Sequence, residues 1–160
     1  MSPTESDLRQ IAKSFLAAFK DLTASDHLVL RAPTCLHIFA PSSLNINNPK
    51  TNDVFAEHVE KNLRPVLDHF PVTAKDIHIN EAGRQITIWA TAVPEFKAEA
   101  MGSSPKEDWD YTGEYIFLLD VDEAGKIIRI VEFLDSLKTE RLRGMMVKAR
   151  ENVGQVGNSW

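Results

Sequence analysis

Hydrophobic side chains recur at two spacings along this chain, and the two spacings separate helical from extended segments. Apolar residues three and four positions apart predict amphipathic helices. Thr4 and Asp7 form a capping box ahead of the first of them, and Pro65 is expected to kink the third. Helices are therefore predicted over residues 5–21, 26–30 and 52–70, and from residue 136 onward.

Alternating polar and apolar positions, rich in β-branched and aromatic residues, predict the strands. The longest such region is a hairpin over residues 107–137, where Gly125 can take the positive φ that the tight loop needs. Pro41 and the Asn-rich stretch after it predict a loop of about ten residues, long enough to form a lip over a pocket. Strands are predicted over residues 35–40, 76–80, 85–92, 111–119 and 127–135.

The hairpin carries apolar residues on both of its faces, which indicates that both faces are covered. We expect a second copy of the chain to cover one of them, so the sequence predicts a homodimer. Acidic side chains interrupt the apolar pattern at Glu114, Glu132 and Asp135. A carboxylate among apolar neighbours is unfavourable unless it is paired, caps a helix or is protonated, so these three are the first candidates for a functional role.

The predicted order is helix, short helix, short strand, helix, four strands and helix, a segregation that is typical of α+β proteins. The predicted fold is a bent antiparallel β-sheet wrapped on three main helices. No repeat or linker divides the chain, so we expect one domain over residues 1–150 and a flexible tail over residues 151–160.

Composition narrows the possible partners. The net charge is −5 and Lys and Arg are scattered, which argues against nucleic acid as a partner. No apolar run approaches the ~20 residues of a membrane span, and the N-terminus is too polar for a secretory signal. The single cysteine, Cys35, has no internal partner for a disulfide, so a reducing, cytoplasmic location is expected.

The final hairpin also carries a family resemblance. An aromatic-rich strand, the turn Gly125-Lys126-Ile127 and an aliphatic strand that ends Glu-Phe-Leu-Asp resemble the last two strands of NTF2-like proteins, in particular the SnoaL-like branch. Glu132 stands where that branch often has Asp, and Asp135 matches its last acid. The order of helices and strands is that of the NTF2-like cone, so the resemblance covers about residues 5–150.

Within that superfamily the chain looks most like fungal SnoaL-like proteins of polyketide and meroterpenoid pathways. The resemblance implies a cone that holds a small apolar ligand, a sheet face that makes a homodimer, and isomerase or cyclase chemistry without a cofactor. An apolar cone pushes a carboxyl or a histidine towards its neutral form, and such a pair can transfer protons at an enolisable carbon near pH 7.

His37 and Glu132 are the leading candidates for that chemistry. His37 lies on the first predicted strand and is expected to act as general base or acid; the alternative is a core histidine bonded to a backbone carbonyl, or one at a dimer contact. Glu132 has Ile130 and Leu134 as its neighbours on one strand face; the alternative is a salt bridge to a nearby arginine. Asp135 is a third candidate acid, and the alternative is an N-cap of the last helix.

Further residues are candidates for substrate binding rather than proton transfer. His58 lies at the edge of the buried stripe of its helix and is expected to look into the cone. Aromatic residues at strand spacing either line the pocket or fill the core and the dimer interface. The candidate substrate-binding residues are Phe39, His58, Trp89, Glu114 and Tyr115.

No metal-binding motif or phosphate-binding glycine loop is present in the sequence, so no metal or cofactor is expected. The leading hypothesis is a cofactor-free isomerase or cyclase of an enolisable, polyketide- or terpenoid-like metabolite in fungal secondary metabolism. Two alternatives stay open: a non-catalytic binding module of the same shape, and a dehydratase that uses the same acid and base.

Overall fold

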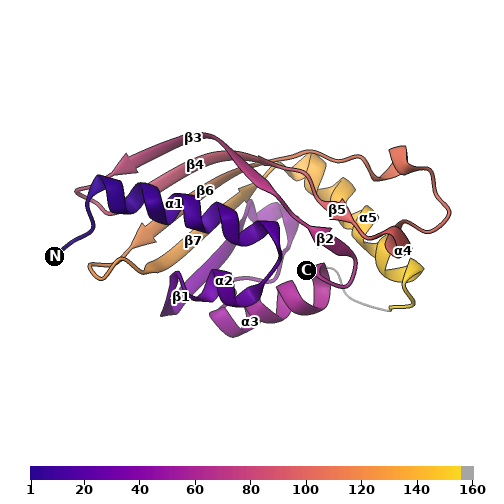
Figure 1. Cartoon of the computed structure of the whole chain (residues 1–160), viewed down its shortest axis with the longest axis horizontal. Coiled ribbons are helices and arrows are strands. Elements are labelled where there is room, and N and C mark those ends of the chain that lie inside the picture. The colour runs from indigo at the N-terminus through magenta and orange to yellow at the C-terminus, as the bar shows by residue number, and fades with distance from the viewer. Residues whose placement is uncertain (156–160) are drawn as a thin grey trace.

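The structure, a computed structural model, describes residues 1–155 of the chain (Figure 1). Five strands form one sheet in the order β1-β7-β6-β4-β3, and a separate pair joins β2 (Leu67–His69) to β5 (Glu95–Phe96). All neighbours in the large sheet are antiparallel except β1, which runs parallel to β7. The strands of the large sheet are β1 (Arg31–Ala40), β3 (Val72–Asn80), β4 (Gln85–Ala92), β6 (Gly113–Val121) and β7 (Ile127–Leu134).

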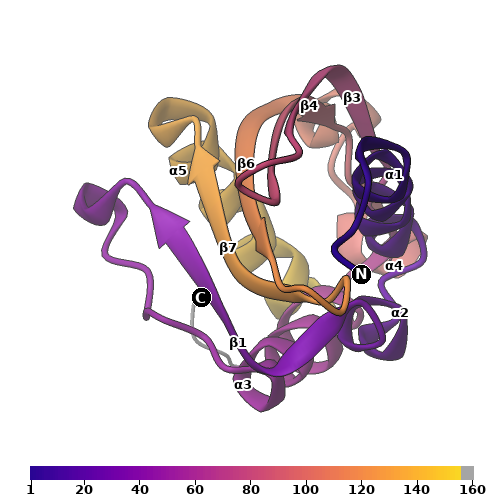
Figure 2. The same ribbon diagram turned by 90° about the vertical axis from the view of Figure 1, so that its left-hand side faces the viewer.

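The sheet is strongly curved, and helices cover its concave side. Figure 2 shows the sheet bending around α1, with α2 and α3 below it. Short helical turns fill the connections: η1 (Ser42–Leu44), η2 (Val59–Leu63) and η3 (Lys106–Trp109). The helices are α1 (Glu5–Lys20), α2 (Ala24–Leu28), α3 (Asn52–His58), α4 (Ala98–Met101) and α5 (Ser136–Asn152).

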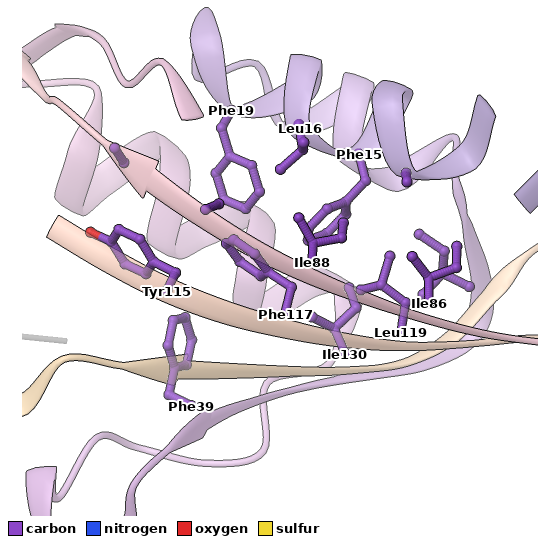
Figure 3. Close-up of a cluster of buried hydrophobic side chains, with 14 of the residues drawn as sticks. Phe15, Leu16, Phe19, Phe39, Ile86, Ile88, Tyr115, Phe117, Leu119 and Ile130 are labelled. Atoms are coloured by element: carbon purple, nitrogen blue, oxygen red, sulfur yellow. The ribbon is translucent and has the colours of Figure 1, made fainter. Parts of the chain in front are cut away.

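The main hydrophobic core lies between α1 and the concave face of the sheet (Figure 3). Phe15 of α1 meets Phe117 of β6 edge to face, with ring centroids 5.1 Å apart. The capping box predicted at Thr4 and Asp7 is present and fixes the start of α1. Apolar burial of this kind is the main stabilising contribution to the fold.

The α+β class and the curved sheet wrapped on helices are confirmed, and β4 has the predicted bounds. The sheet is mixed rather than wholly antiparallel, because β1 enters beside β7 in the same direction. β1 also begins at Arg31, several residues before the predicted start. α5 continues to Asn152, so it includes the start of the predicted tail, and residues 156–160 of that tail lie outside the described residues.

The predicted helix over residues 52–70 is shorter than expected. α3 ends at His58 and continues as a single π-helical turn, η2, closed by the Arg64 N–H donating to the Val59 carbonyl over 3.0 Å. Pro65 has no N–H to continue the helix and disfavours helical geometry at the residue before it. The chain then turns into β2, so the proline ends the helix instead of kinking it.

The predicted lip after Pro41 does not reach over the pocket. The segment folds back along β1 instead, where the backbones of Lys50 and His37 exchange two hydrogen bonds of 2.9 and 2.8 Å. The Asn48 side chain imitates a strand partner, because its oxygen accepts from the Phe39 N–H and its nitrogen donates to the Phe39 carbonyl. This segment protects the free edge of β1.

Candidate active site

An apolar cavity lies between the concave face of the sheet and the helices α1, α2, α3 and α5. It contains about 590 Å³ of space when its open mouth is included, but its free internal volume is only about 40 Å³. Leu63 and Phe70 are the partly buried residues of its wall, and a ligand larger than the free volume requires wall side chains to move. The wall consists of Phe19, Leu22, His27, Phe39, Phe55, His58, Val59, Leu63, Phe70, Tyr115, Glu132, Leu134, Thr139, Leu142 and Met146.

Glu132 is the only carboxylic acid in the wall of this cavity, as far as the described residues show. It lies on β7, paired with Phe117 of β6 on one side and Phe39 of β1 on the other. The alternation along β7 places Glu132 inward together with Ile130 and Leu134, as the sequence predicts. Only 8% of the residue is exposed, so its carboxyl is held in a largely apolar environment.

His37 contacts the Glu132 carboxyl without being part of the cavity wall. Its Nε2 lies 3.0 Å from Glu132 Oε1, and its Nδ1 lies 3.1 Å from Arg31 Nη2. Because a guanidinium can only donate, Nδ1 must accept, which places the single proton of the neutral ring on Nε2. The His37 ring therefore donates its Nε2–H to Glu132 and accepts a hydrogen bond from Arg31.

The His37 ring itself is fully buried and lies outside the cavity wall. It is stacked between Phe39 and Phe55, at centroid distances of 4.7 Å to each and interplanar angles of 18° and 14°. A ring enclosed in this way cannot reach a ligand in the cavity. The structure thus places the predicted acid/base histidine one layer behind the cavity, in position to orient Glu132.

Burial and charge set the protonation states in this group. Burial raises the pKa of Glu132 to about 8, although the Arg31 guanidinium lowers it in part. Burial, with the nearby Arg31 charge, holds the pKa of His37 well below its usual value, so the ring is neutral at pH 7. Arg31 lies 4.0 Å from the centre of the Phe55 ring, and burial lowers its pKa only to about 10, so it remains charged.

His58 and Tyr115 do line the cavity, as the sequence predicts, and so does Phe39. Asn62 lies 3.1 Å from His58 Nδ1, and burial lowers the pKa of His58 to about 3. The hydroxyl of Tyr115 hydrogen-bonds to that of Tyr111, and burial raises the pKa of Tyr115 well above its usual value. These groups remain neutral at pH 7 and contribute hydrogen-bonding atoms rather than charge.

His27 is a cavity residue that the sequence analysis missed. It lies in α2, is 1% exposed and contacts Phe19 and Phe55 edge to face. A single histidine in a five-residue helix has no periodic pattern from which its orientation could be deduced. Only the packing of α2 against α1 and α3 turns it into the cavity wall.

Three predicted site residues do not reach the cavity. Trp89 and Glu114 lie on the outer face of the sheet, where the indole Nε1–H donates to Glu114 over 2.6 Å. β4 and β6 bury Ala90 and Tyr115 on the concave face, so the residues before them must point outward. Asp135 is exposed and caps α5, its side chain accepting from the Lys138 N–H, which is the alternative that the sequence left open.

Within residues 1–155, no group of three or more His, Cys, Asp or Glu side chains is placed to hold a metal ion. In the same part of the chain, no helix has the length and apolar character needed to cross a membrane.

Comparison with solved structures defines the class of fold. The chain aligns with PrhC from Penicillium brasilianum over 94% of its length and 93% of that chain, with a TM-score of 0.78 and 18% identity. It aligns with the pinacolase BvnE from Penicillium brevicompactum over 92% and 99%, with a TM-score of 0.77 and 19% identity. An NTF2-like protein of Burkholderia pseudomallei matches with a TM-score of 0.65, 12% identity and 85% and 96% coverage. The chain therefore has the NTF2-like fold.

Comparison of sequences finds relatives among proteins of fungal biosynthesis clusters. It is 27% identical over 147 residues to the austinoid biosynthesis cluster protein F of Aspergillus calidoustus, which covers 89% of this chain and 77% of the relative. It is also 27% identical to a protein F of the austinoid clusters of Penicillium brasilianum, over 96% of this chain and 97% of the relative. No family profile matches the chain. The resemblance to NTF2-like proteins of fungal biosynthesis is confirmed.

Proposed function

We propose that this protein is a cofactor-independent isomerase or cyclase, in which Glu132 transfers protons on an enolisable terpenoid- or polyketide-like metabolite. One observation carries the proposal: a buried carboxyl with a pKa near 8 lies in the wall of an apolar cavity, and His37 orients it from behind. A general acid or base is most effective when its pKa lies near the working pH, because both protonation states are then accessible.

The chemistry follows from the two forms of the carboxyl. As a carboxylate, Glu132 takes a proton from a carbon next to a carbonyl, and the electron pair of the broken C–H bond moves into the enolate. The carboxylic acid then returns the proton to another carbon of the conjugated system, which moves the double bond and restores the carboxylate. His37 donates its Nε2–H in either form, so Glu132 keeps its orientation during the exchange.

The choice of substrate class is supported by the relatives. Several of them are proteins of austinoid biosynthesis clusters, and BvnE is a pinacolase, an activity that we do not transfer to this chain. The largely aliphatic and aromatic cavity wall suits a polycyclic hydrocarbon skeleton with few oxygen atoms. We therefore expect the substrate to be an oxygenated terpenoid or polyketide intermediate.

The test is proton exchange on a model ketone. The protein is incubated in D₂O with 1-tetralone and larger enolisable polycyclic ketones, and deuterium uptake beside the carbonyl is followed by NMR. Glu132→Gln should lower the protein-dependent rate by about 10²–10⁴. Glu114→Gln, on the outer face, is the matched control and should keep the parent rate. Ketones that bind without exchange, or exchange that survives Glu132→Gln, would contradict the proposal and favour a binding module.

We propose further that the protein works as a homodimer through the outer face of its sheet. Large apolar side chains are exposed on neighbouring strands there: Trp89 at 38%, Leu118 at 41%, Ile128 at 38% and Phe133 at 49%. Exposed apolar patches of this kind mark interaction surfaces. Two copies related by a twofold axis would cover the same patch on each other, as in most symmetric dimers.

A further inference from the structure

His27 differs from the other buried histidines of this protein in its hydrogen bonding. Within residues 1–155, neither ring nitrogen of His27 has a hydrogen-bond partner, although the residue is only 1% exposed. His37 is hydrogen-bonded through both of its nitrogens, and Nδ1 of His58 contacts Asn62. Buried polar groups are almost always paired, because an unpaired one is unfavourable in the folded protein. The position of His27 therefore calls for an explanation other than stability.

The surroundings of His27 are apolar, and within residues 1–155 they leave both of its ring nitrogens without a partner. The ring is part of the cavity wall, and its nearest rings are those of Phe19 and Phe55, which hold it edge to face at 4.6 and 5.1 Å. Leu22, which is fully buried, also lines the cavity. These apolar neighbours hold the ring in place but form no hydrogen bond with its nitrogens. The two nitrogens therefore keep their hydrogen-bonding capacity.

The protonation state of His27 defines which ligand atom it can bind. Burial, together with the Arg31 charge, lowers the pKa of His27 to about 3, so the ring is neutral at pH 7. A neutral imidazole offers one N–H donor and one nitrogen acceptor. It can donate to a carbonyl or hydroxyl oxygen, but it offers no positive charge to a carboxylate.

We propose that His27 anchors the ligand by donating a hydrogen bond to its carbonyl oxygen, and so selects oxygenated skeletons over pure hydrocarbons. This inference rests on the proposed function and deepens it, because it names a group that the substrate must carry. His27 is on α2, in the helical wall of the cavity, and Glu132 is on β7, in the sheet wall. The ligand is thus held by a polar contact on each wall, with apolar surface between them.

The experiment measures binding and needs no turnover. Affinities for 1-tetralone and for tetralin, which lacks the carbonyl, are measured by calorimetry on the parent protein and on His27→Phe. The parent should prefer the ketone by about tenfold, the ratio expected for one hydrogen bond in an apolar site. His27→Phe should lose most of this preference. His78→Phe makes the same change at an exposed histidine and should keep the preference.

Stability and NMR provide two further readouts. Because the phenyl ring removes two unpaired polar atoms, His27→Phe should melt at or above the temperature of the parent protein. In the parent protein, the ¹⁵N resonance of the protonated His27 nitrogen should shift more at saturation with 1-tetralone than at saturation with tetralin, which has no hydrogen-bond acceptor. This spectrum decides the question even where the variant fails to fold.

Several outcomes would overturn the inference: no preference for the ketone in the parent, no binding of either compound, an unchanged preference in His27→Phe, or a ¹⁵N shift no larger with 1-tetralone than with tetralin. Its failure is distinct from failure of the proposed function. If Glu132→Gln stops proton exchange while His27→Phe keeps the ketone preference, only the anchoring role is wrong. If His27→Phe loses the preference while Glu132→Gln still exchanges protons, only the catalytic role of Glu132 is wrong.

Discussion

His37 Nε2 lies 3.0 Å from Glu132 Oε1, and this contact joins residues 95 positions apart in the chain. The direction of the hydrogen bond is fixed, because Arg31 donates to the other ring nitrogen and leaves the only ring proton on Nε2. Such a histidine holds the carboxyl in one orientation and has no free atom for a ligand. In the reaction that we propose, the proton-transfer role therefore falls to Glu132, with His37 as its positioning residue.

Stability should depend on pH through Glu132. Because the pKa of this carboxyl is raised to about 8 in the folded protein, its neutral form favours folding. That stabilisation is fully present below the unfolded pKa, near 4.5, and is lost as the pH rises towards 8. Glu132→Gln stays neutral, so it should be more stable than the parent by a few kcal/mol at pH 9, on the order set by the pKa shift. Urea unfolding at pH 5 and pH 9 measures this, and an equal difference at both pH values would contradict it.

His37→Ala should unfold at a markedly lower temperature than the parent. The change leaves a void between Phe39 and Phe55 and removes the partner of both Arg31 and Glu132, at a cost of about 3 kcal/mol or more. A protein of this size then melts roughly 6–12 °C lower. His37→Gln retains a donor and an acceptor and should recover part of both stability and proton exchange. If His37→Ala melts like the parent, the positioning role is wrong.

Gly113→Ala should disturb the cavity although Gly113 is not one of its wall residues. A Cβ at Gly113 would lie 2.6 Å from the Tyr115 hydroxyl and 2.8 Å from that of Tyr111, so the tyrosine pair must move. We expect a loss of about 1–3 kcal/mol, measured by thermal unfolding. Gly144→Ala in α5 meets no atom within 4 Å and should stabilise the protein by up to about 1 kcal/mol. A destabilised Gly144→Ala with an unaffected Gly113→Ala would contradict this account.

Light scattering at micromolar concentration should report about twice the 18.0 kDa of one chain. Phe133→Lys places a charge on the exposed apolar face of the sheet and should shift the mass to that of a monomer. Leu137→Lys changes a residue that is 83% exposed and lies in α5 rather than in a strand of the sheet, and it should leave the dimer intact. A parent protein that is monomeric would mean that the outer face has no partner in solution.

The sequence predicted the fold class from periodicity, since apolar spacing indicates which face of α1 is buried and alternation identifies β4 and β6 as strands. It did not decide which face of β6 is buried, because both faces of the hairpin carry apolar residues. The sequence pattern also could not predict, for every residue of β7, which face of the sheet its side chain occupies. A register shift between β6 and β7 places both Ile127 and Ile130 inward, whereas strict alternation assigns them to opposite faces. From Ile130 onward the alternation holds, which is why Glu132 shares a face with Ile130 and Leu134, as the sequence predicted.

The candidate site was predictable only in part. Whether a side chain lines the cavity or is enclosed behind its wall depends on tertiary packing, which the sequence pattern does not show. His37 and Glu132 do meet, but the sequence carries no sign that Phe39 and Phe55 enclose the His37 ring. Asp135 lies directly after a strand and before a helix, where capping and pocket roles share the same pattern. His27 was missed for the opposite reason, since a very short helix carries no pattern at all.

The central claim is that Glu132 is a carboxyl that is protonated near neutral pH in the wall of an apolar cavity. Titration of the ¹³C-labelled side-chain carboxyl of Glu132 by NMR tests it most directly, with Glu132→Gln to assign the resonance. We expect an apparent pKa near 8, which a bound ketone leaves well above the usual glutamate value. A pKa near 4.5 would mean that the carboxyl is an ordinary, ionised partner of Arg31 and His37, and the proposed proton transfer would lose its basis.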